Sequence, residues 1–201
     1  MKSTMMNNNT KQVTIYCASS NKIPQEYFAQ AEEMTKILVE AGYGIRYGGG
    51  EIGLMGVVAN TALKHKGRVT GIIPHFMSER EWEHKGVSDM IRVDTMHQRK
   101  ELLIKDSCAV IALAGGTGTL DELFDVLSLK KLGQYPYPVI LLNTNDFYRP
   151  LIELAERMAD EKFIRNVHLK LWTVISSPND IIKAIEGGEL WGADTLDIAA
   201  V

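Results

Sequence analysis

The chain is predicted to fold as a single α/β domain around a doubly wound, mostly parallel β-sheet. Two observations predict this fold class. Short apolar runs alternate with longer helical patterns along nearly the whole sequence. The runs are apolar throughout instead of alternating with polar residues, which is typical of strands whose sheet is covered by helices on both faces. A length of 201 residues suits one such core.

The first half of the chain shows the alternation clearly. An apolar strand over 13–17 is followed by a helix from about 24 to 40, which Pro24 suits as a first-turn residue and Gly42 as a C-terminal cap. Apolar residues recur on one face of this helix at helical spacing. A strand over 44–47, a helix over 54–65 and a strand over 68–73, which Pro74 ends, complete this half.

The second half repeats the pattern. A short strand over 90–93 leads to a helix over 96–106, and the apolar run 108–113 leads through a glycine-rich loop to a helix over 119–132. The remaining predicted elements are a strand over 139–142, a helix over 150–161, a strand over 172–175 and a helix over 178–186. The predicted Rossmann-like domain spans 12–190, with a disordered N-terminal tail over 1–11 and a C-terminal tail over 191–201.

Composition excludes several classes of partner. A net charge of −3 and a pI near 6.0 argue against a nucleic-acid-binding surface. No apolar run approaches the roughly 20 residues that span a bilayer, and residues 1–12 are too polar for a signal peptide. Cys17 and Cys108 fall in apolar runs and indicate buried thiols in a reducing compartment, so a cytoplasmic location is expected. The five histidines lack metal-ligand spacing, and neither a metal nor a cofactor is expected.

The segment Gly115-Gly116-Thr117-Gly118-Thr119 is the strongest indication of a ligand site, because it lies between a buried strand and a helix start. Backbone amides at such a turn, together with the helix dipole, favour a bound phosphate. The spacing Thr119-x-x-Glu122 also fits a capping box. Capping alone, however, does not require three preceding glycines. Glu122 follows closely enough to reach whatever carries the phosphate, and its expected place in the first turn would favour the ionised form.

A second glycine-rich turn comprises Gly48, Gly49, Gly50 and Gly53, and Met55 follows it. Gly48, Gly50 and Gly53 have the spacing of a dinucleotide-binding fingerprint, but the turn follows the second strand and no acidic residue ends the next one. A backbone that lines a ligand, or a tight turn that packs a helix on the sheet, fits better.

Two smaller groups complete the candidate site. Arg99 and Lys100 follow Met96 near the start of a predicted helix, where positive charge opposes the helix dipole, so pairing with an anion competes with simple solvent exposure. Ser19 follows the first strand, where its hydroxyl could donate to a phosphate or sugar, or begin a turn.

Taken together, these motifs resemble the LONELY GUY (LOG) family of cytokinin-activating phosphoribohydrolases. The family has a P-G-G-x-G-T-x-x-E loop, a G-G-G-x-x-G-L-M-G turn and an M-x-x-R-K helix, and this sequence has similar motifs in the same order from Gly48 to Glu122. Two positions depart from the family pattern, since Ala114 stands in place of Pro and Ala18 in place of Gly.

The resemblance implies hydrolysis of the N-glycosidic bond of a nucleoside 5′-monophosphate, such as AMP or an N6-substituted AMP. It implies Arg99 and Glu122 as the catalytic pair, a 5′-phosphate at the loop 115–119, and a nucleotide pocket lined by Met96 and the turn 48–53. Ser19 and, more weakly, Glu81 are further implied contacts. It also implies a homodimer with the site close to the subunit interface.

Competing functions share the fold. A carrier of a nucleotide or of the molybdenum cofactor would hold a phosphorylated ligand without cleaving it, although the presence of both Arg99 and Glu122 favours the enzyme. A nicotinamide oxidoreductase is the third reading. A lysine decarboxylase is disfavoured, because nothing identifies a Schiff-base lysine with its cofactor partners.

Overall fold

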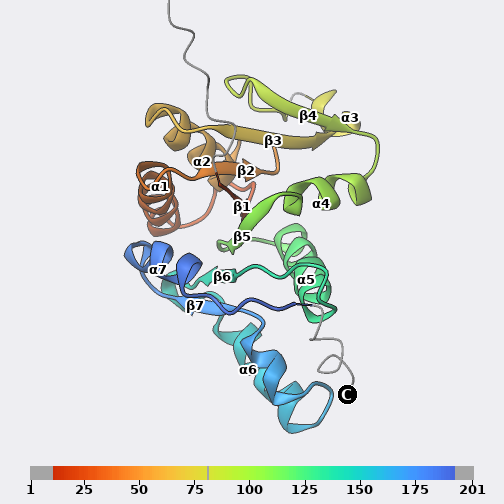
Figure 1. The fold of residues 1–201 in the computed structure, drawn as a ribbon. Coiled ribbons are helices and arrows are strands. Elements are labelled where there is room, and N and C mark those ends of the chain that lie inside the picture. The colour runs from red at the N-terminus through yellow and green to blue at the C-terminus, as the bar shows by residue number, and fades with distance from the viewer. Residues whose placement is uncertain (1–10, 81, 193–201) are drawn as a thin grey trace, which may run out of the picture.

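The computed structural model describes residues 11–80 and 82–192, which form a seven-stranded parallel sheet with the order β4-β3-β2-β1-β5-β6-β7 (Figure 1). Every pair of neighbouring strands is parallel. The doubly wound α/β prediction is therefore confirmed. The strands are β1 (Gln12–Tyr16), β2 (Gly44–Tyr47), β3 (Val69–Pro74), β4 (Asp89–Val93), β5 (Ser107–Ala112), β6 (Val139–Leu142) and β7 (Thr173–Ile175).

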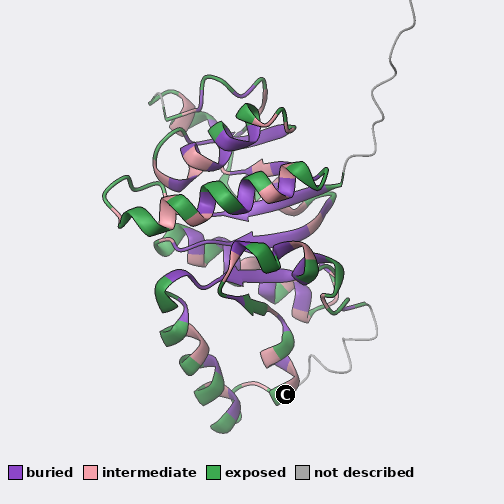
Figure 2. Cartoon of the chain, turned by 90° about the vertical axis from the view of Figure 1, so that its left-hand side faces the viewer, coloured by how far each residue is buried: buried purple, intermediate pink, exposed green. Residues whose placement is uncertain are grey.

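Helices cover both faces of this sheet. They are α1 (Gln25–Glu40), α2 (Gly53–Lys64), α3 (His75–Ser78), α4 (Met96–Ile104), α5 (Thr117–Lys131), α6 (Arg149–Asp160) and α7 (Ile181–Glu186), with 3-10 turns over 144–146, 166–170 and 178–180. Buried side chains of α1, α2 and α7 pack with one face, and those of α4 and α5 pack with the other. Figure 2 shows the buried sheet between helices whose outer sides are exposed.

Alternation along the central strands separates the two cores. In β1, Val13 and Ile15 belong to the core under α1 and α2, whereas Tyr16 belongs to the core under α5. The partner of Ile15 in β5 is Ile111, which points to the same side. Both faces of the inner strands β5 and β6 are buried almost throughout, which is why these two strands read as apolar runs.

Two boundaries differ from the prediction in ways that affect function. Helix α5 begins at Thr117 instead of 119, and its N-cap is Gly116, which has no capping side chain. The predicted capping role of Thr119 is therefore wrong, and Glu122 lies in the second turn of the helix instead of the first. Trp191, which the sequence assigns to the C-terminal tail, is buried in the core under α5, so the packed chain extends at least to that residue.

The topology places a ligand crevice between β1 and β5. The chain leaves β1 toward α1 on one face and leaves β5 toward α5 on the other, so the two connections diverge at the carboxyl ends of adjacent strands. Ligands of doubly wound sheets bind at such switch points. The Ser19 turn and the glycine loop at 115–119 both follow these two strands.

Candidate active site

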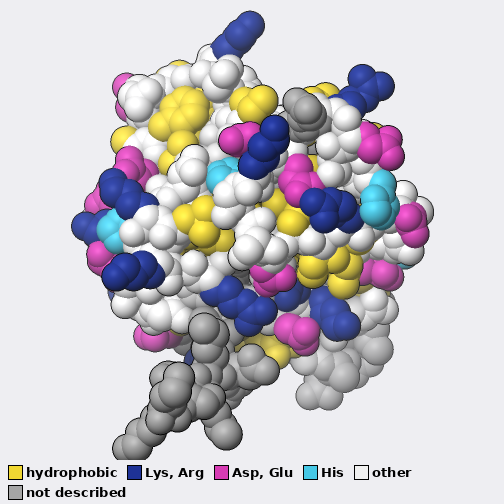
Figure 3. Space-filling view, turned by 90° about the horizontal axis from the view of Figure 1, so that it is seen from above, with side chains coloured by type: hydrophobic (Ala, Val, Ile, Leu, Met, Phe, Trp, Pro, Cys, Tyr) yellow, Lys and Arg dark blue, Asp and Glu magenta, His cyan; other side chains and the backbone are white. Residues whose placement is uncertain are grey.

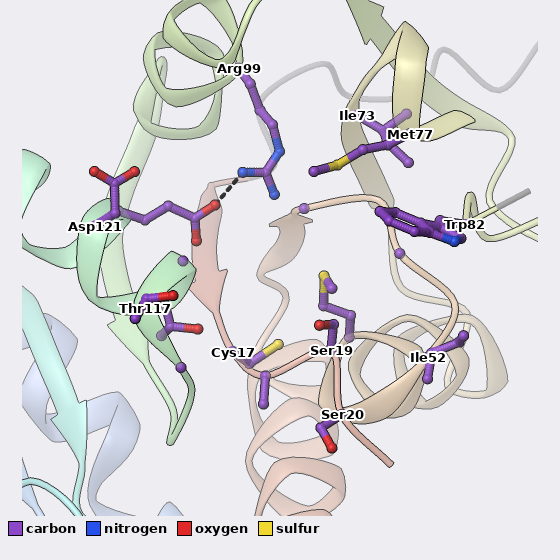
Figure 4. A pocket seen from close by; sticks show the side chains of 18 of the residues that line it. Cys17, Ser19, Ser20, Ile52, Ile73, Met77, Trp82, Arg99, Thr117 and Asp121 are labelled. Atoms are coloured by element: carbon purple, nitrogen blue, oxygen red, sulfur yellow. Dashed lines mark hydrogen bonds and ion pairs between the residues drawn. The ribbon is translucent and has the colours of Figure 1, made fainter. Parts of the chain in front are cut away.

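A cavity of about 580 Å³ lies at the carboxyl ends of the central strands. Most of the predicted site residues line it, although they come from four separate segments of the chain. These are Ser19, Gly48, Gly50, Met55, Met96, Arg99, Gly116, Thr117, Gly118, Thr119 and Glu122. Figure 4 shows Arg99 pointing into this cavity, with Ser19 and Ser20 on the opposite side. Thr117 lies on a third side, which α5 forms.

The central feature of the cavity is a buried ion pair. The Nη1 of Arg99 on α4 donates to Oε1 of Glu122 on α5, which the dashed line in Figure 4 marks. The Nε of Arg99 also donates to the carbonyl oxygen of Ile72 at 3.2 Å. Only 7% of Arg99 and 8% of Glu122 are exposed. The pair therefore has a fixed geometry in a site of low polarity, where electrostatic interactions are strong.

Glu122 has a perturbed carboxyl group. Burial raises its pKa above the ordinary value of 4.5, and the Arg99 guanidinium opposes this by lowering the pKa. The expectation that the helix dipole keeps Glu122 ionised is wrong, because the residue is one turn too far into α5. Arg99 is the group that stabilises the carboxylate. Carboxyl groups in clefts whose pKa is shifted by burial and by a specific charged partner are typical of functional sites.

The glycines around the cavity fall into two groups. In the first group, glycine is required because a side chain would collide with neighbouring protein atoms. A Cβ at Gly48 would lie 2.3 Å from Nη2 of Arg99, one at Gly53 would lie 2.5 Å from the backbone of Ser19, and one at Gly115 would lie 2.1 Å from Oγ1 of Thr119. The spacing of Gly48, Gly50 and Gly53 therefore has a local explanation, since this turn admits Arg99 and packs α2 against the Ser19 turn.

Gly116 and Gly118 form the second group. A Cβ at either position would meet no described protein atom within 4 Å, yet both residues line the cavity at the start of α5. Packing does not explain why glycine stands at these two positions. A ligand that approaches the backbone closely does. The free N–H groups of the first turn of α5 point to the same place and suit an anion.

Several predicted site residues do not line the cavity. Gly49, Gly53 and Gly115 are not among its lining residues, and a Cβ at each of them would crowd neighbouring protein atoms. Lys100 points away and bridges α4 to α5, with Nζ 3.1 Å from Oδ1 of Asp125 and 3.4 Å from Oδ1 of Asp121. This follows from helical geometry, because Arg99 and Lys100 are neighbours about 100° apart around the axis and cannot share a direction. Glu81 lies outside the described residues.

One wall of the cavity was not predictable from the sequence motifs. Ile73, Met77 and Trp82 line it from the end of β3 and the segment after it (Figure 4). These residues carry no motif, and a half-exposed Trp in a loop gives no periodic signal. Among the residues that line the cavity there is no lysine, and no group of three or more His, Cys, Asp or Glu suited to a metal ion occurs among the described residues.

Fold and cavity together define an α/β protein that presents a carboxylate–guanidinium pair beside a helix N-terminus. A family model described as "Possible lysine decarboxylase" matches residues 55–185. The cytokinin riboside 5′-monophosphate phosphoribohydrolase of Rhodococcoides fascians is 41% identical over 155 residues, which cover 77% of this chain and 78% of that protein. The protein of the same name from Arabidopsis thaliana, LOG2, is 34% identical over 84% of this chain and 78% of its own length.

The chain therefore belongs to the LONELY GUY family, as the sequence motifs predicted. A solved structure of the molybdenum cofactor carrier protein from Chlamydomonas reinhardtii has the same fold, with a TM-score of 0.69 over 89% of this chain and 98% of that one. Its sequence identity of 16% supports the fold alone.

Proposed function

We propose that the protein hydrolyses the N-glycosidic bond of a nucleoside 5′-monophosphate, AMP or an N6-substituted AMP, to a free base and ribose 5-phosphate. The observation that carries this proposal is the buried Arg99–Glu122 pair beside the open N-terminus of α5. The names of the curated relatives point to the same chemistry.

The start of α5 would hold the 5′-phosphate. Its first-turn N–H groups and the hydroxyl of Thr117 can donate to the phosphate oxygens, and Gly116 and Gly118 leave room for them. A phosphate fixed there would hold the ribose against the side chain one turn further along the helix, which is Glu122. Positioning of this kind lowers the barrier by removing translational and rotational freedom beforehand.

Glu122 would act on the anomeric carbon. As the bond from C1′ to the base nitrogen breaks, its electron pair leaves with the base and positive charge develops on the ribose. The carboxylate stabilises that charge, orients the water whose oxygen bonds to C1′ and accepts the proton that this water loses, while the nitrogen of the departing base takes up a proton from solvent. Arg99 stays protonated, so we assign it to holding Glu122 ionised and oriented, and not to protonating the leaving base.

Two features extend the proposal. We infer a homodimer, supported by a small apolar groove that the exposed side chains Phe124 of α5 and Leu154 of α6 both line. We also infer a cytoplasmic location. No helix among the described residues is both long and apolar enough to cross a membrane.

Acidic and basic side chains are interspersed on the face in Figure 3, as the small net charge suggests, and we propose neither a nucleic acid nor a cofactor as a partner.

The first test of this function is Glu122→Gln. We expect kcat for AMP to fall by about 10²- to 10⁴-fold, because an amide cannot stabilise positive charge or accept a proton. Glu153→Gln is the matched control, since Glu153 pairs with Arg149 on α6, away from the cavity. Released base is measured by chromatography for AMP, N6-prenyl AMP and their unphosphorylated nucleosides.

The outcomes separate the candidate functions. Normal turnover by Glu122→Gln would contradict the role of the carboxylate, and a preference for unphosphorylated nucleosides would contradict the phosphate site. Tight retention of nucleotide without product over a long incubation would favour a carrier. Light scattering of the purified protein tests the homodimer.

A further inference from the structure

The wall of the cavity opposite α5 carries a large aromatic side chain that packing does not explain. Trp82 lines the cavity but keeps 49% of its surface exposed, and it belongs to neither core cluster. Figure 4 shows Trp82 beside Met77 and Ile73, across the cavity from Thr117. An indole that lines a cavity and remains half-exposed offers a large apolar surface to a ligand.

Main-chain hydrogen bonds fix the backbone on which Trp82 stands. Residues 82–84, which we call the strap, pair with the glycine turn after β2. The N–H of Glu51 donates to the carbonyl oxygen of Trp82 at 3.1 Å, and the N–H of His84 donates to that of Gly49 at 2.9 Å. Gly50 and Glu83 form an antiparallel bridge between these two bonds.

The side chain of Glu83 anchors the middle of the strap. Its carboxylate accepts from the Nε and Nη2 of Arg92 on β4, with 3.0 Å between Nε and Oε2, and from the hydroxyl of Ser78 at the end of α3. A bidentate pair of this kind restricts rotation more than a single contact does. Glu83 has a side chain only 16% exposed, so solvent screens this pair less than a fully exposed one.

In extended backbone, successive side chains point to opposite sides, so anchoring Glu83 on one side sets the direction of Trp82 on the other. The phosphate and ribose contacts of the proposed function lie on the α5 side of the cavity. This leaves the apolar side, where Trp82 lies, for the base.

Resting on the proposed function, we propose that Trp82 stacks on the base of the nucleotide and that the Glu83–Arg92 pair is a positioning device that holds Trp82 there. Trp82 then contributes to recognition of any planar base, while Glu83 and Arg92 act only through it.

The test compares four variants by steady-state kinetics with AMP and by inhibition with ribose 5-phosphate, which has no base. Trp82→Ala should raise KM for AMP about tenfold, in the range reported for base–aromatic stacking, with a smaller change in kcat. Trp82→Phe should retain most of the affinity. Glu83→Gln should also raise KM for AMP. The double variant Glu83→Gln/Trp82→Ala should have a KM no higher than that of Trp82→Ala alone.

The ribose 5-phosphate inhibition constant should stay unchanged in all four variants. Asp89→Asn is the matched control, because Asp89 also lies on β4 and pairs with an arginine, Arg68, at 3.4 Å. It should leave KM unchanged. Binding of AMP should change the fluorescence of the wild-type protein, and Trp82→Phe should lose that change.

Failure of the two proposals can be told apart. If the wild-type protein binds AMP without hydrolysing it, the hydrolase proposal fails, and the stacking proposal is still decided by the AMP affinity of Trp82→Ala. If AMP is hydrolysed and Trp82→Ala keeps its KM, the stacking proposal is overturned. Additive effects of Glu83→Gln and Trp82→Ala would overturn the positioning role of Glu83.

Discussion

Arg99 combines three contacts that depend on one another. Its guanidinium pairs with Glu122, its Nε donates to the carbonyl oxygen of Ile72, and its Nη2 occupies the space that a side chain at Gly48 would need. Burying an ionised carboxylate without a partner costs on the order of several kcal/mol, because the charge loses its hydration. Arg99 therefore makes an ionised Glu122 possible inside the cavity, and Gly48 makes this position of Arg99 possible.

This arrangement predicts the pH dependence of activity. Burial raises the pKa of Glu122 above 4.5 and Arg99 lowers it, so the acid limb of kcat/KM should lie above pH 4.5. In Arg99→Gln the lowering influence is lost, and the acid limb should move to still higher pH. The measurement is kcat/KM for AMP across pH 4 to 9, with Arg149→Gln as the control. An acid limb that stays in place in Arg99→Gln would show that Arg99 does not stabilise the carboxylate.

At the scale of elements, α4 and α5 bring the pair together. Helix α4 begins with a capping box in which the N–H of Gln98 donates to Oγ1 of Thr95 at 3.1 Å, and the side chain of Gln98 accepts from the N–H of Thr95 at 3.3 Å. Lys100 then joins α4 to α5 through Asp121 and Asp125. The start of α4 is thus fixed by its own residues, whereas the start of α5 has no capping side chain and keeps its N–H groups free.

Because the start of α5 is free, a substitution there is predicted to raise stability and to weaken substrate binding. Gly118 lies in the first turn of α5, and a methyl group there meets no described protein atom. Gly118→Ala should therefore raise the free energy of unfolding by up to about 0.5–1 kcal/mol, because alanine loses less conformational freedom in a helix. The same methyl group would enter the proposed phosphate site, so KM for AMP should rise.

Urea unfolding and steady-state kinetics of Gly118→Ala measure the two effects. Gly192→Ala is the control, since its Cβ also meets no described protein atom within 4 Å and Gly192 does not line the cavity. A Gly118→Ala protein with unchanged KM would mean that no ligand approaches the backbone at this point.

At the scale of the whole molecule, the sheet and its helices were predictable, because apolar periodicity depends on local sequence. The bounds predicted for β2 and β6, 44–47 and 139–142, are those of the structure. The strand order and the pairing of Arg99 with Glu122 depend on packing between distant segments, which periodicity does not encode. The family motifs named both residues, but only the fold shows that they contact each other. Neither apolar periodicity nor the family motifs indicated Trp82, because this residue lies in a loop and belongs to no motif.

Lys130 links three distant parts of the fold. It lies in the last turn of α5, only 2% exposed, and its Nζ donates to the carbonyl oxygen of Tyr137 at 2.7 Å and of Glu189 at 3.2 Å. These bonds tie α5 to the start of β6 and to the segment that carries the buried Trp191. Both acceptors are neutral carbonyl groups, and burial lowers the pKa of Lys130 to about 8.

This lowered pKa predicts how stability responds to alkaline pH. Between pH 8 and 10, the unfolded chain keeps the Lys130 proton and the folded protein releases it, so Lys130 contributes a rise of the free energy of unfolding with pH. Cys17 and Cys108 contribute a fall over the same range, because burial raises the pKa of both thiols in the folded protein and unfolding lets them ionise. The rise due to Lys130 is therefore read as the difference between the wild-type protein and a variant that lacks this lysine. Lys130→Met removes the titrating group and should remove this rise, while Lys170→Met, on an exposed lysine, should keep it. Urea unfolding at pH 7.5, 8.5 and 9.5 makes the comparison, below the range where buried tyrosines titrate. If the free energy of unfolding of Lys130→Met changes with pH as that of the wild-type protein does, Lys130 keeps its proton in the folded protein throughout this range, and its two carbonyl bonds outweigh the cost of burial.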